Sequence, residues 1–148
     1  MANLFGTDGI RGAANRYPMI PEVAAALGRA VGGYFGGENG ALVVIGTDTR
    51  QSSDMLAAAA AAGVCSAGAG VLMAGVIPTP AVARLAVESK AAAGIVVSAS
   101  HNPFGDNGLK VFTGEGFKPD PALERRIEDR VLSALGADLR AVDFGAGI

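Results

Sequence analysis

Residues 94–103 read Gly-Ile-Val-Val-Ser-Ala-Ser-His-Asn-Pro. The apolar run 94–97 predicts a short buried strand, and Pro103 cannot continue a central strand because it lacks a backbone donor. A polar loop that follows such a strand is where α/β proteins often place reactive groups. This loop holds Ser100 and the single histidine of the chain, His101. We therefore expect Ser100 to be the reactive centre.

The next segment, residues 106–110, reads Asp-Asn-Gly-Leu-Lys. Its Asn-Gly pair predicts a tight turn, which would place Lys110 just beyond the turn and ten residues after Ser100. Residues 109–112 are then a candidate hairpin partner of the 94–97 strand, or an edge strand.

Strands and helices alternate along the rest of the chain. A buried strand is expected over residues 41–45 and a third short apolar segment over 71–73. Helices are expected over residues 21–35, about 54–67 with Ser52 or Ser53 as cap, 79–88 with Thr79 as cap, and about 121–135. Alternation of this kind predicts an α/β layered domain with a mostly parallel mixed sheet flanked by helices.

Length and composition narrow the class of protein. The chain has 148 residues, 50% of them hydrophobic and 18% charged, and its net charge is -2. These values favour one folded domain and argue against a basic surface that binds nucleic acid. No basic leader and no long apolar run are present, so we expect a cytoplasmic protein with no membrane partner. The one cysteine, Cys65, lies in an alanine-rich run and is interpreted as a core residue.

Two more glycine-containing loops carry charged residues. Residues 5–12 form a glycine-rich stretch around Thr7, Asp8 and Arg11, typical of a tight loop rather than a regular element. Residues 46–50 read Gly-Thr-Asp-Thr-Arg and follow the 41–45 strand. Each loop has a plainer interpretation: an ordinary turn for the first, and for the second a loop whose salt bridge shapes the edge of the sheet.

A reactive Ser100 could serve either a serine hydrolase or an enzyme that transfers a phosphoryl group. A serine hydrolase is disfavoured because no Gly-x-Ser-x-Gly pattern occurs and the only histidine adjoins Ser100, whereas the base of a triad usually comes from elsewhere in the chain. Phosphoryl transfer needs cations around phosphate oxygens, a metal ion and a proton-exchanging group. Arg11, Arg50 and Lys110 could supply the cations and the proton-exchanging group.

Four segments resemble those of the α-D-phosphohexomutase family and occur in its order. They are residues 5–12, 46–50, 78–83 and 98–110. The first and last are most similar to the bacterial phosphoglucosamine mutase branch. The resemblance implies a sugar phosphomutase that works through a phosphoserine.

The resemblance also implies roles for single residues. Ser100 corresponds to the phosphoserine, and Ser98 does not. Lys110 and Arg11 match residues implicated in proton transfer and charge stabilisation, and His101 lies at the same site, although it could also be an ordinary loop residue. The expected substrate or phosphate contacts are Thr7, Arg50 and Asn102.

Members of this family have four domains and use Mg²⁺, so the resemblance implies that residues 1–136 form the first domain and residues 137–148 a linker. No Asp-x-Asp-x-Asp pattern occurs, so the expected metal contact of this chain is a phosphate on Ser100. The implied partners are a hexosamine phosphate and the remaining domains, and the fragment alone is expected to be inactive. Alternatives are a phosphomannomutase/phosphoglucomutase domain and a non-catalytic phosphate-binding or interaction module.

Overall fold

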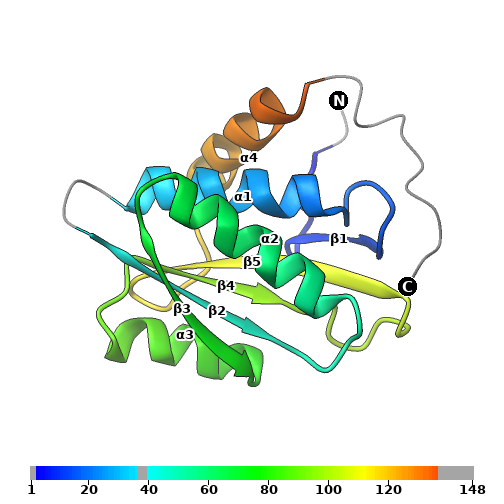
Figure 1. Ribbon diagram of the computed structural model, residues 1–148, viewed down its shortest axis with the longest axis horizontal. Coiled ribbons are helices and arrows are strands. Elements are labelled where there is room, and N and C mark those ends of the chain that lie inside the picture. The colour runs from blue at the N-terminus through cyan, green and yellow to red at the C-terminus, as the bar shows by residue number, and fades with distance from the viewer. Residues whose placement is uncertain (1–2, 37–39, 137–148) are drawn as a thin grey trace.

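A computed structural model describes residues 3–36 and 40–136. The expected linker, residues 137–148, lies outside the described residues. Strands and helices alternate as the sequence predicts (Figure 1). Their bounds are β1 (Ile10–Ala13), α1 (Pro21–Phe35), β2 (Leu42–Thr47), α2 (Ser53–Ser66), β3 (Gly70–Val76), α3 (Thr79–Glu88), β4 (Ala93–Val97), β5 (Asp106–Thr113) and α4 (Pro121–Leu135).

The strands form one mixed sheet in the order β1-β5-β4-β2-β3. β2 pairs in parallel with β3 and β4, whereas β5 pairs antiparallel with β4 and β1. Among the described strands, β5 alone therefore runs against the others. This arrangement confirms an α/β domain with a mostly parallel mixed sheet.

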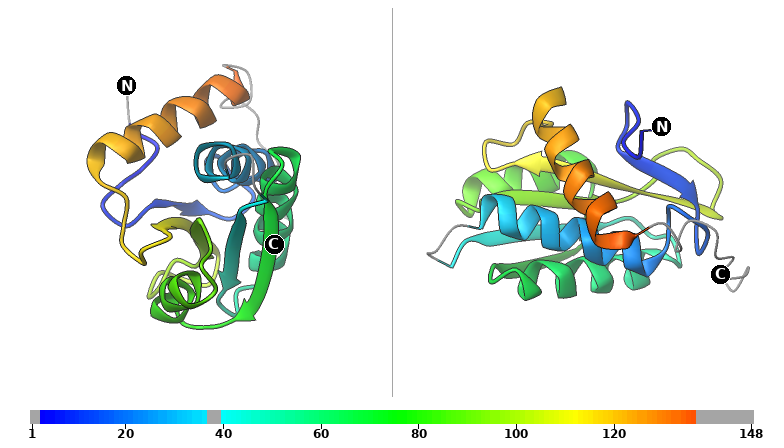
Figure 2. Two further views of the ribbon diagram at one scale, coloured as in Figure 1. Left: turned by 90° about the vertical axis from the view of Figure 1, so that its left-hand side faces the viewer. Right: turned by 90° about the horizontal axis from the view of Figure 1, so that it is seen from above.

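Helices cover both faces of the sheet (Figure 2). α1 and α2 lie on one face with α4 packed against α1, and α3 lies on the other face. The side chains of β2 alternate between the two layers: Val43 and Ile45 enter the core with α1 and α2, and Val44 packs with Val82 of α3. Because both faces of this central strand are covered, it is a continuous apolar run rather than an alternating one.

Small residues set the distance between α1 and α2. A Cβ on Gly28 of α1 would clash with the carbonyl oxygen of Ala60 in α2, and a Cβ on Gly63 of α2 would clash with the carbonyl oxygen of Ala25 in α1. Both glycines therefore allow the two helix backbones to lie close together. α2 therefore packs closely against the backbone of α1 while it also contacts β2 and β3 of the sheet.

Three local predictions were wrong. The Asn107-Gly108 pair is no turn but lies inside β5, which is the hairpin partner of β4 and not an edge strand. The N-cap residue of α3 is Pro78 and not Thr79. Ser52 is the N-cap residue of α2 as expected, but its side chain forms no capping bond, and the buried Asn107 amide donates to the hydroxyls of Ser52 (2.7 Å) and Ser53 (3.1 Å). The glycine-rich first loop also contains a regular element, since β1 pairs with β5 from Ile10 onward.

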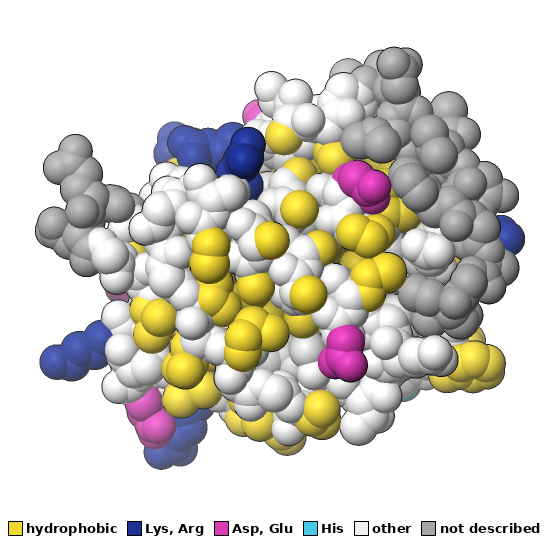
Figure 3. Space-filling model, viewed as in Figure 1, with side chains coloured by type: hydrophobic (Ala, Val, Ile, Leu, Met, Phe, Trp, Pro, Cys, Tyr) yellow, Lys and Arg dark blue, Asp and Glu magenta, His cyan; other side chains and the backbone are white. Residues whose placement is uncertain are grey.

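Apolar side chains are exposed along the edge strand β3. Apolar side chains are spread over the face that α2 and β3 present (Figure 3). Leu72, Met73 and Val76 of the edge strand β3 are exposed. Cys65 at the end of α2 is exposed as well, which corrects the interpretation of it as a core residue. Within the described residues, no helix combines the length and apolarity needed to cross a membrane.

Candidate functional site

Ser100 lies in the loop that joins β4 to β5, at an exposed position. Its φ of 54° is in the left-handed region, where a non-glycine residue costs on the order of 1 kcal/mol. The Ser100 amide donates to the Oγ atom of the buried Ser98 at 3.0 Å, and the Asn102 amide donates to the Ala99 carbonyl at 3.1 Å. These bonds stabilise a tight turn that presents the Ser100 side chain outward.

Two cationic side chains reach the Ser100 hydroxyl. Lys110 Nζ lies 3.1 Å and Arg11 Nη2 lies 3.4 Å from Ser100 Oγ. Arg11 comes from β1 and Lys110 from β5, and the register pairs Arg11 with Gly108. A Cβ on Gly108 would lie 3.2 Å from Arg11 Cγ, so the glycine leaves space for the arginine to cross β5 toward the loop. The hydroxyl thus sits in a positively charged environment.

The same environment changes the acidity of Lys110. Partial burial lowers the pKa of Lys110 below its usual value, the neighbouring Arg11 charge lowers it further, and Asp8 opposes both. A lowered pKa increases the fraction of neutral amine near pH 7. Lys110 is therefore better able to accept a proton than an isolated lysine.

Asn102 lies between the cations and the loop. Its Oδ1 accepts from Arg11 Nη1 at 3.2 Å, and its Nδ2 donates to Asp106 Oδ2 at 3.2 Å. The structure therefore brings four of the predicted site residues together: Ser100, Lys110, Arg11 and Asn102.

Arg50 is at the same loop, but its guanidinium is directed at protein groups. Arg50 Nε donates to Asp48 Oδ2 at 2.9 Å, and Nη2 donates to the carbonyl oxygens of Ser100 (3.0 Å) and Asn102 (2.9 Å). The Arg50 side chain is only 9% exposed. The salt bridge anticipated within the 46–50 loop is present.

Asp48 is held as a carboxylate. Burial raises the pKa of Asp48, but hydrogen bonds from the Arg50 amide and from Ser98, Ser53 and the Arg50 side chain outweigh it, and the net pKa lies below its usual value. Ser53 Oγ in turn accepts from Asn107 Nδ2. A chain of partly or fully buried polar groups therefore links the loop to α2 and β5.

Thr7 and His101 do not join this network. Thr7 is exposed in the loop before β1, and its carbonyl accepts from Lys118 Nζ at 2.8 Å. His101 is exposed beside Ser100. Within residues 3–36 and 40–136, neither side chain forms a hydrogen bond to Ser100. A histidine base for a hydrolytic serine is thus not in place.

Ser98, Ser53 and Asn107 were not predicted as part of the site. Ser98 was set aside because the phosphate carrier is the serine next to the histidine, and Asn107 was interpreted as a turn residue. A buried asparagine must find partners for its amide, but the burial of Asn107 follows from the pairing of β5 and no pattern in the sequence indicates it.

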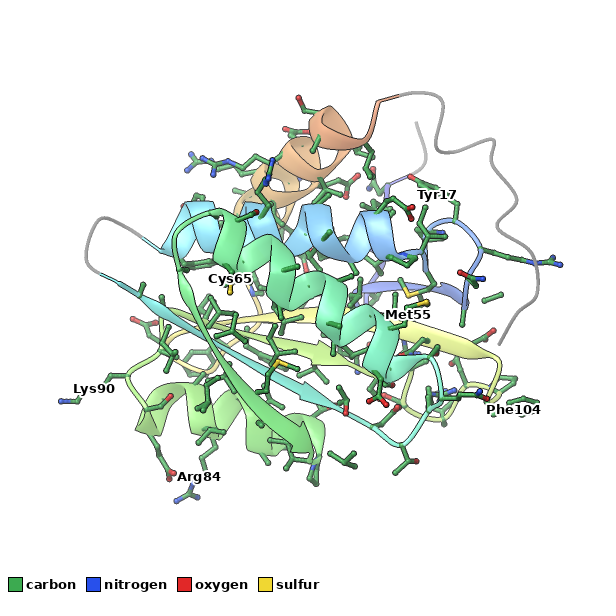
Figure 4. The ribbon with its side chains drawn as sticks, viewed as in Figure 1. Tyr17, Met55, Cys65, Arg84, Lys90 and Phe104 are labelled. Carbon is green, nitrogen blue, oxygen red and sulfur yellow. The ribbon has the colours of Figure 1, made fainter. Side chains whose placement is uncertain are left out.

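A hollow opens beside Ser100. It encloses about 410 Å³ and is lined by Asp48, Thr49, Arg50, Gln51, Ser100, Asn102 and Phe104. Phe104 is 90% exposed and projects from the loop at the edge of the molecule (Figure 4). The volume falls within the range of small-molecule sites, roughly 300–1,000 Å³.

The described residues do not supply a metal centre of their own. Among them, no cluster of three or more histidine, cysteine or acidic side chains could hold a metal ion. Two carboxylates near Ser100 are already engaged, Asp48 by Arg50 and Asp106 by the Asn102 amide. The arrangement favours a hydroxyl that carries an anionic group between cations.

Comparison with known proteins agrees with this chemistry. The family described as phosphoglucomutase/phosphomannomutase, alpha/beta/alpha domain I, matches residues 2–136. The phosphoglucosamine mutase of Desulforapulum autotrophicum is 56% identical over 135 residues, which cover 90% of this chain and 29% of the relative. The phosphoglucosamine mutase of Desulforudis audaxviator is 53% identical over 148 residues, which cover 99% of this chain and 33% of the relative.

A solved structure supports the same relationship. The phosphoglucomutase/phosphomannomutase family protein of Burkholderia thailandensis superimposes with a TM-score of 0.73 at 30% identity, over 88% of this chain and 30% of that one. The chain thus spans about a third of the length of the curated relatives it matches. On these grounds the chain belongs to the phosphoglucomutase/phosphomannomutase family, as its α/β/α domain I.

Proposed function

We propose that this chain is the phosphoserine domain of a phosphoglucosamine mutase. The whole enzyme interconverts glucosamine 6-phosphate and glucosamine 1-phosphate through the 1,6-bisphosphate and so supplies amino sugar for cell-wall precursors in the cytoplasm. The observation that carries the proposal is the contact of Ser100 Oγ with Lys110 Nζ (3.1 Å) and Arg11 Nη2 (3.4 Å). The choice of glucosamine phosphate as substrate rests on the relatives, which are phosphoglucosamine mutases.

In the first half-reaction the phosphoryl group leaves Ser100 for the free hydroxyl of the sugar phosphate. The bond between Ser100 Oγ and phosphorus breaks, a bond between the sugar oxygen and phosphorus forms, and the sugar hydroxyl loses its proton. Neutral Lys110 accepts that proton and passes it to the departing Ser100 Oγ, 3.1 Å away, while the permanent charge of Arg11 stabilises the transferring phosphoryl oxygens. After the bisphosphate turns round, Ser100 Oγ attacks its other phosphoryl group, Lys110 takes the proton of the serine hydroxyl, and the departing sugar oxygen receives that proton.

The remaining predicted residues have a place in this proposal. Asn102 orients Arg11 through its Oδ1 atom. Thr7 and His101, which are exposed, would contact a phosphate of the substrate.

Mg²⁺ would supply a further positive charge on the phosphoryl oxygens when bound. The described residues do not form a metal centre, so the contribution of this chain is a phosphate oxygen on Ser100. We place the other metal ligands in the remaining domains, together with the groups that select the sugar and bind its distal phosphate. The 148-residue chain alone is then expected to show no mutase turnover, because it lacks binding energy that the transition state requires.

The proposal is tested by assaying the whole protein with glucosamine, mannose and glucose phosphates. A clear preference for glucosamine 6-phosphate is expected, and a preference for mannose or glucose phosphates would assign the chain to the phosphomannomutase/phosphoglucomutase branch instead. Incubation with a ³²P-labelled hexose 1,6-bisphosphate should label Ser100. Absence of labelling and turnover in the wild-type protein would favour a non-catalytic module, and labelling of Ser100 by an acylating reagent would favour a hydrolase.

A further inference from the structure

Every N–H donor of the Arg50 guanidinium is used within the protein. Nε binds Asp48, and Nη2 binds the carbonyl oxygens of Ser100 and Asn102. Nη1 binds the carbonyl oxygens of Asp106, at 3.1 Å, and Pro103. Because a guanidinium has five N–H donors, all five are engaged and none is left for a ligand.

Four of the five acceptors are backbone carbonyls: three belong to the loop that carries Ser100, and the fourth belongs to Asp106, the first residue of β5. Carbonyl oxygens that converge on one point repel one another unless a cation lies between them. The loop has few backbone bonds of its own, among them Asn102 N to Ala99 O and Asp106 N to Pro103 O. The shape of the loop therefore depends on the planar guanidinium that its carbonyls surround.

Arg50 is itself fixed to the rigid part of the domain. Asp48 Oδ1 accepts from the Arg50 amide (3.0 Å) and from Ser53 Oγ (3.0 Å), and Oδ2 accepts from Arg50 Nε. Ser53 belongs to α2, and Asn107 of β5 donates to it. The guanidinium thus connects a strand-end loop to the first turn of a helix and to a central strand.

We propose that Arg50 is a positioning residue that holds Ser100 at a fixed distance from Lys110 and Arg11, and that it does not bind the substrate. The inference rests on the proposed function and replaces the expectation that Arg50 contacts a substrate phosphate. By holding the Ser100 carbonyl, Arg50 favours the left-handed backbone of that residue and keeps Oγ directed at the two cations.

The test compares Arg50→Lys with Arg84→Lys in the whole protein. Lysine keeps the positive charge at position 50, but its single nitrogen cannot span four carbonyls and a carboxylate. Arg84 forms an exposed ion pair with Glu88 at 2.7 Å, so its replacement controls for the loss of an arginine elsewhere. Two quantities are measured: kcat and KM for the sugar phosphate, and hydrogen exchange of the amides of residues 98–106 relative to those of β4.

Arg50→Lys should lower kcat about 100-fold, the loss that a misplacement of about 1 Å can cause, with KM within about twofold of wild type. Exchange in residues 98–106 should rise at least about tenfold while β4 amides and Arg84→Lys stay at wild-type values. A tenfold higher KM with unchanged kcat and loop exchange would show that Arg50 binds substrate, and wild-type behaviour in all measurements would show that it has no role.

Two further outcomes are decisive. If Arg50→Lys does not fold, Asp48→Asn keeps the arginine and removes the charge that orients it, and the same changes are expected. If wild-type protein lacks mutase turnover, the proposed function fails. Loop exchange then still decides whether Arg50 positions Ser100.

Discussion

Gly28→Ala and Gly33→Ala change the same residue type in the same helix and should have opposite effects on stability. Gly28 faces α2, where a Cβ would clash with the Ala60 carbonyl oxygen and lie 3.0 Å from the Val64 amide nitrogen. Gly33 is on the exposed side of α1, where the nearest atom to a Cβ would be Arg130 Nη1 at 3.5 Å. Only the first substitution requires α1 and α2 to move apart.

The magnitudes follow from two opposing effects. Replacing glycine by alanine within a helix raises the free energy of unfolding by roughly 0.5–1 kcal/mol at either position, chiefly because it lowers the entropy of the unfolded chain. Overpacking costs about 1–3 kcal/mol, and the upper part of that range applies at Gly28 because the atoms it meets are helix backbone that cannot turn aside. We expect Gly28→Ala to lower the free energy of unfolding by about 2 kcal/mol and Gly33→Ala to raise it by about 0.5 kcal/mol.

Urea unfolding of wild type and both variants, followed by circular dichroism, measures these differences. If the m-value is unchanged, the substitution has altered the free energy of unfolding and has not altered the compactness of the folded or the unfolded state. Equal stabilisation by both alanines would refute the reasoning, because it would mean that α1 and α2 do not approach through Gly28.

The remaining predictions concern the site. Ser100→Ala should abolish transfer of label from a hexose 1,6-bisphosphate to the protein, which mass spectrometry of the Ser100 peptide would detect; labelling that persists would place the carrier elsewhere. Lys110→Met should lower kcat of the whole enzyme by roughly 10²–10⁴-fold, the usual contribution of a positioned acid or base, while calorimetry shows an equal or higher melting temperature. The folded pKa of Lys110 is lowered, so keeping it protonated costs stability at all pH values below its unfolded pKa, and a neutral side chain removes that cost. Asp48 has a lowered folded pKa, so it stabilises the fold above its usual pKa of 3.8, and this contribution is lost as pH falls through the folded pKa. Acid titration of Asp48→Asn should therefore show a smaller loss of stability below about pH 4 than wild type does, and an equal loss would contradict the assignment.

The order of helices and strands could be read from the sequence because each element carries a local signal. The apolar runs at 41–45 and 94–97 are long enough to identify buried strands, and Pro21 and Pro121 lie at the first positions of α1 and α4. In α4, apolar residues recur every four positions, and Ile127, Val131 and Leu135 are buried. Local signals of this kind do not depend on the rest of the fold.

Features that depend on distant segments were harder to predict. The Asn107-Gly108 pair is typical of a turn, but the pairing of β5 with β1 and β4 outweighs that local preference. The position of Arg50 under the loop follows from the tertiary packing of β2 beside β4, which no spacing in the sequence reveals. The loop after the 94–97 strand favours Ser100 as the reactive centre, but the choice of Ser100 over Ser98 as phosphate carrier rests on the resemblance of these residues to a known family.

The pairing of β1 with β5 has a consequence for how the site tolerates changes in chain length. Arg11 and Lys110 lie on one face of the sheet because Arg11 is opposite Gly108, two residues from Lys110. Side chains alternate between the two faces of a strand. Deletion of Leu109, the residue between Gly108 and Lys110, would therefore turn the lysine side chain toward the core and bring an apolar side chain to Ser100. Insertions and deletions that preserve chemistry here must come in pairs of residues or fall in the loops outside the strands.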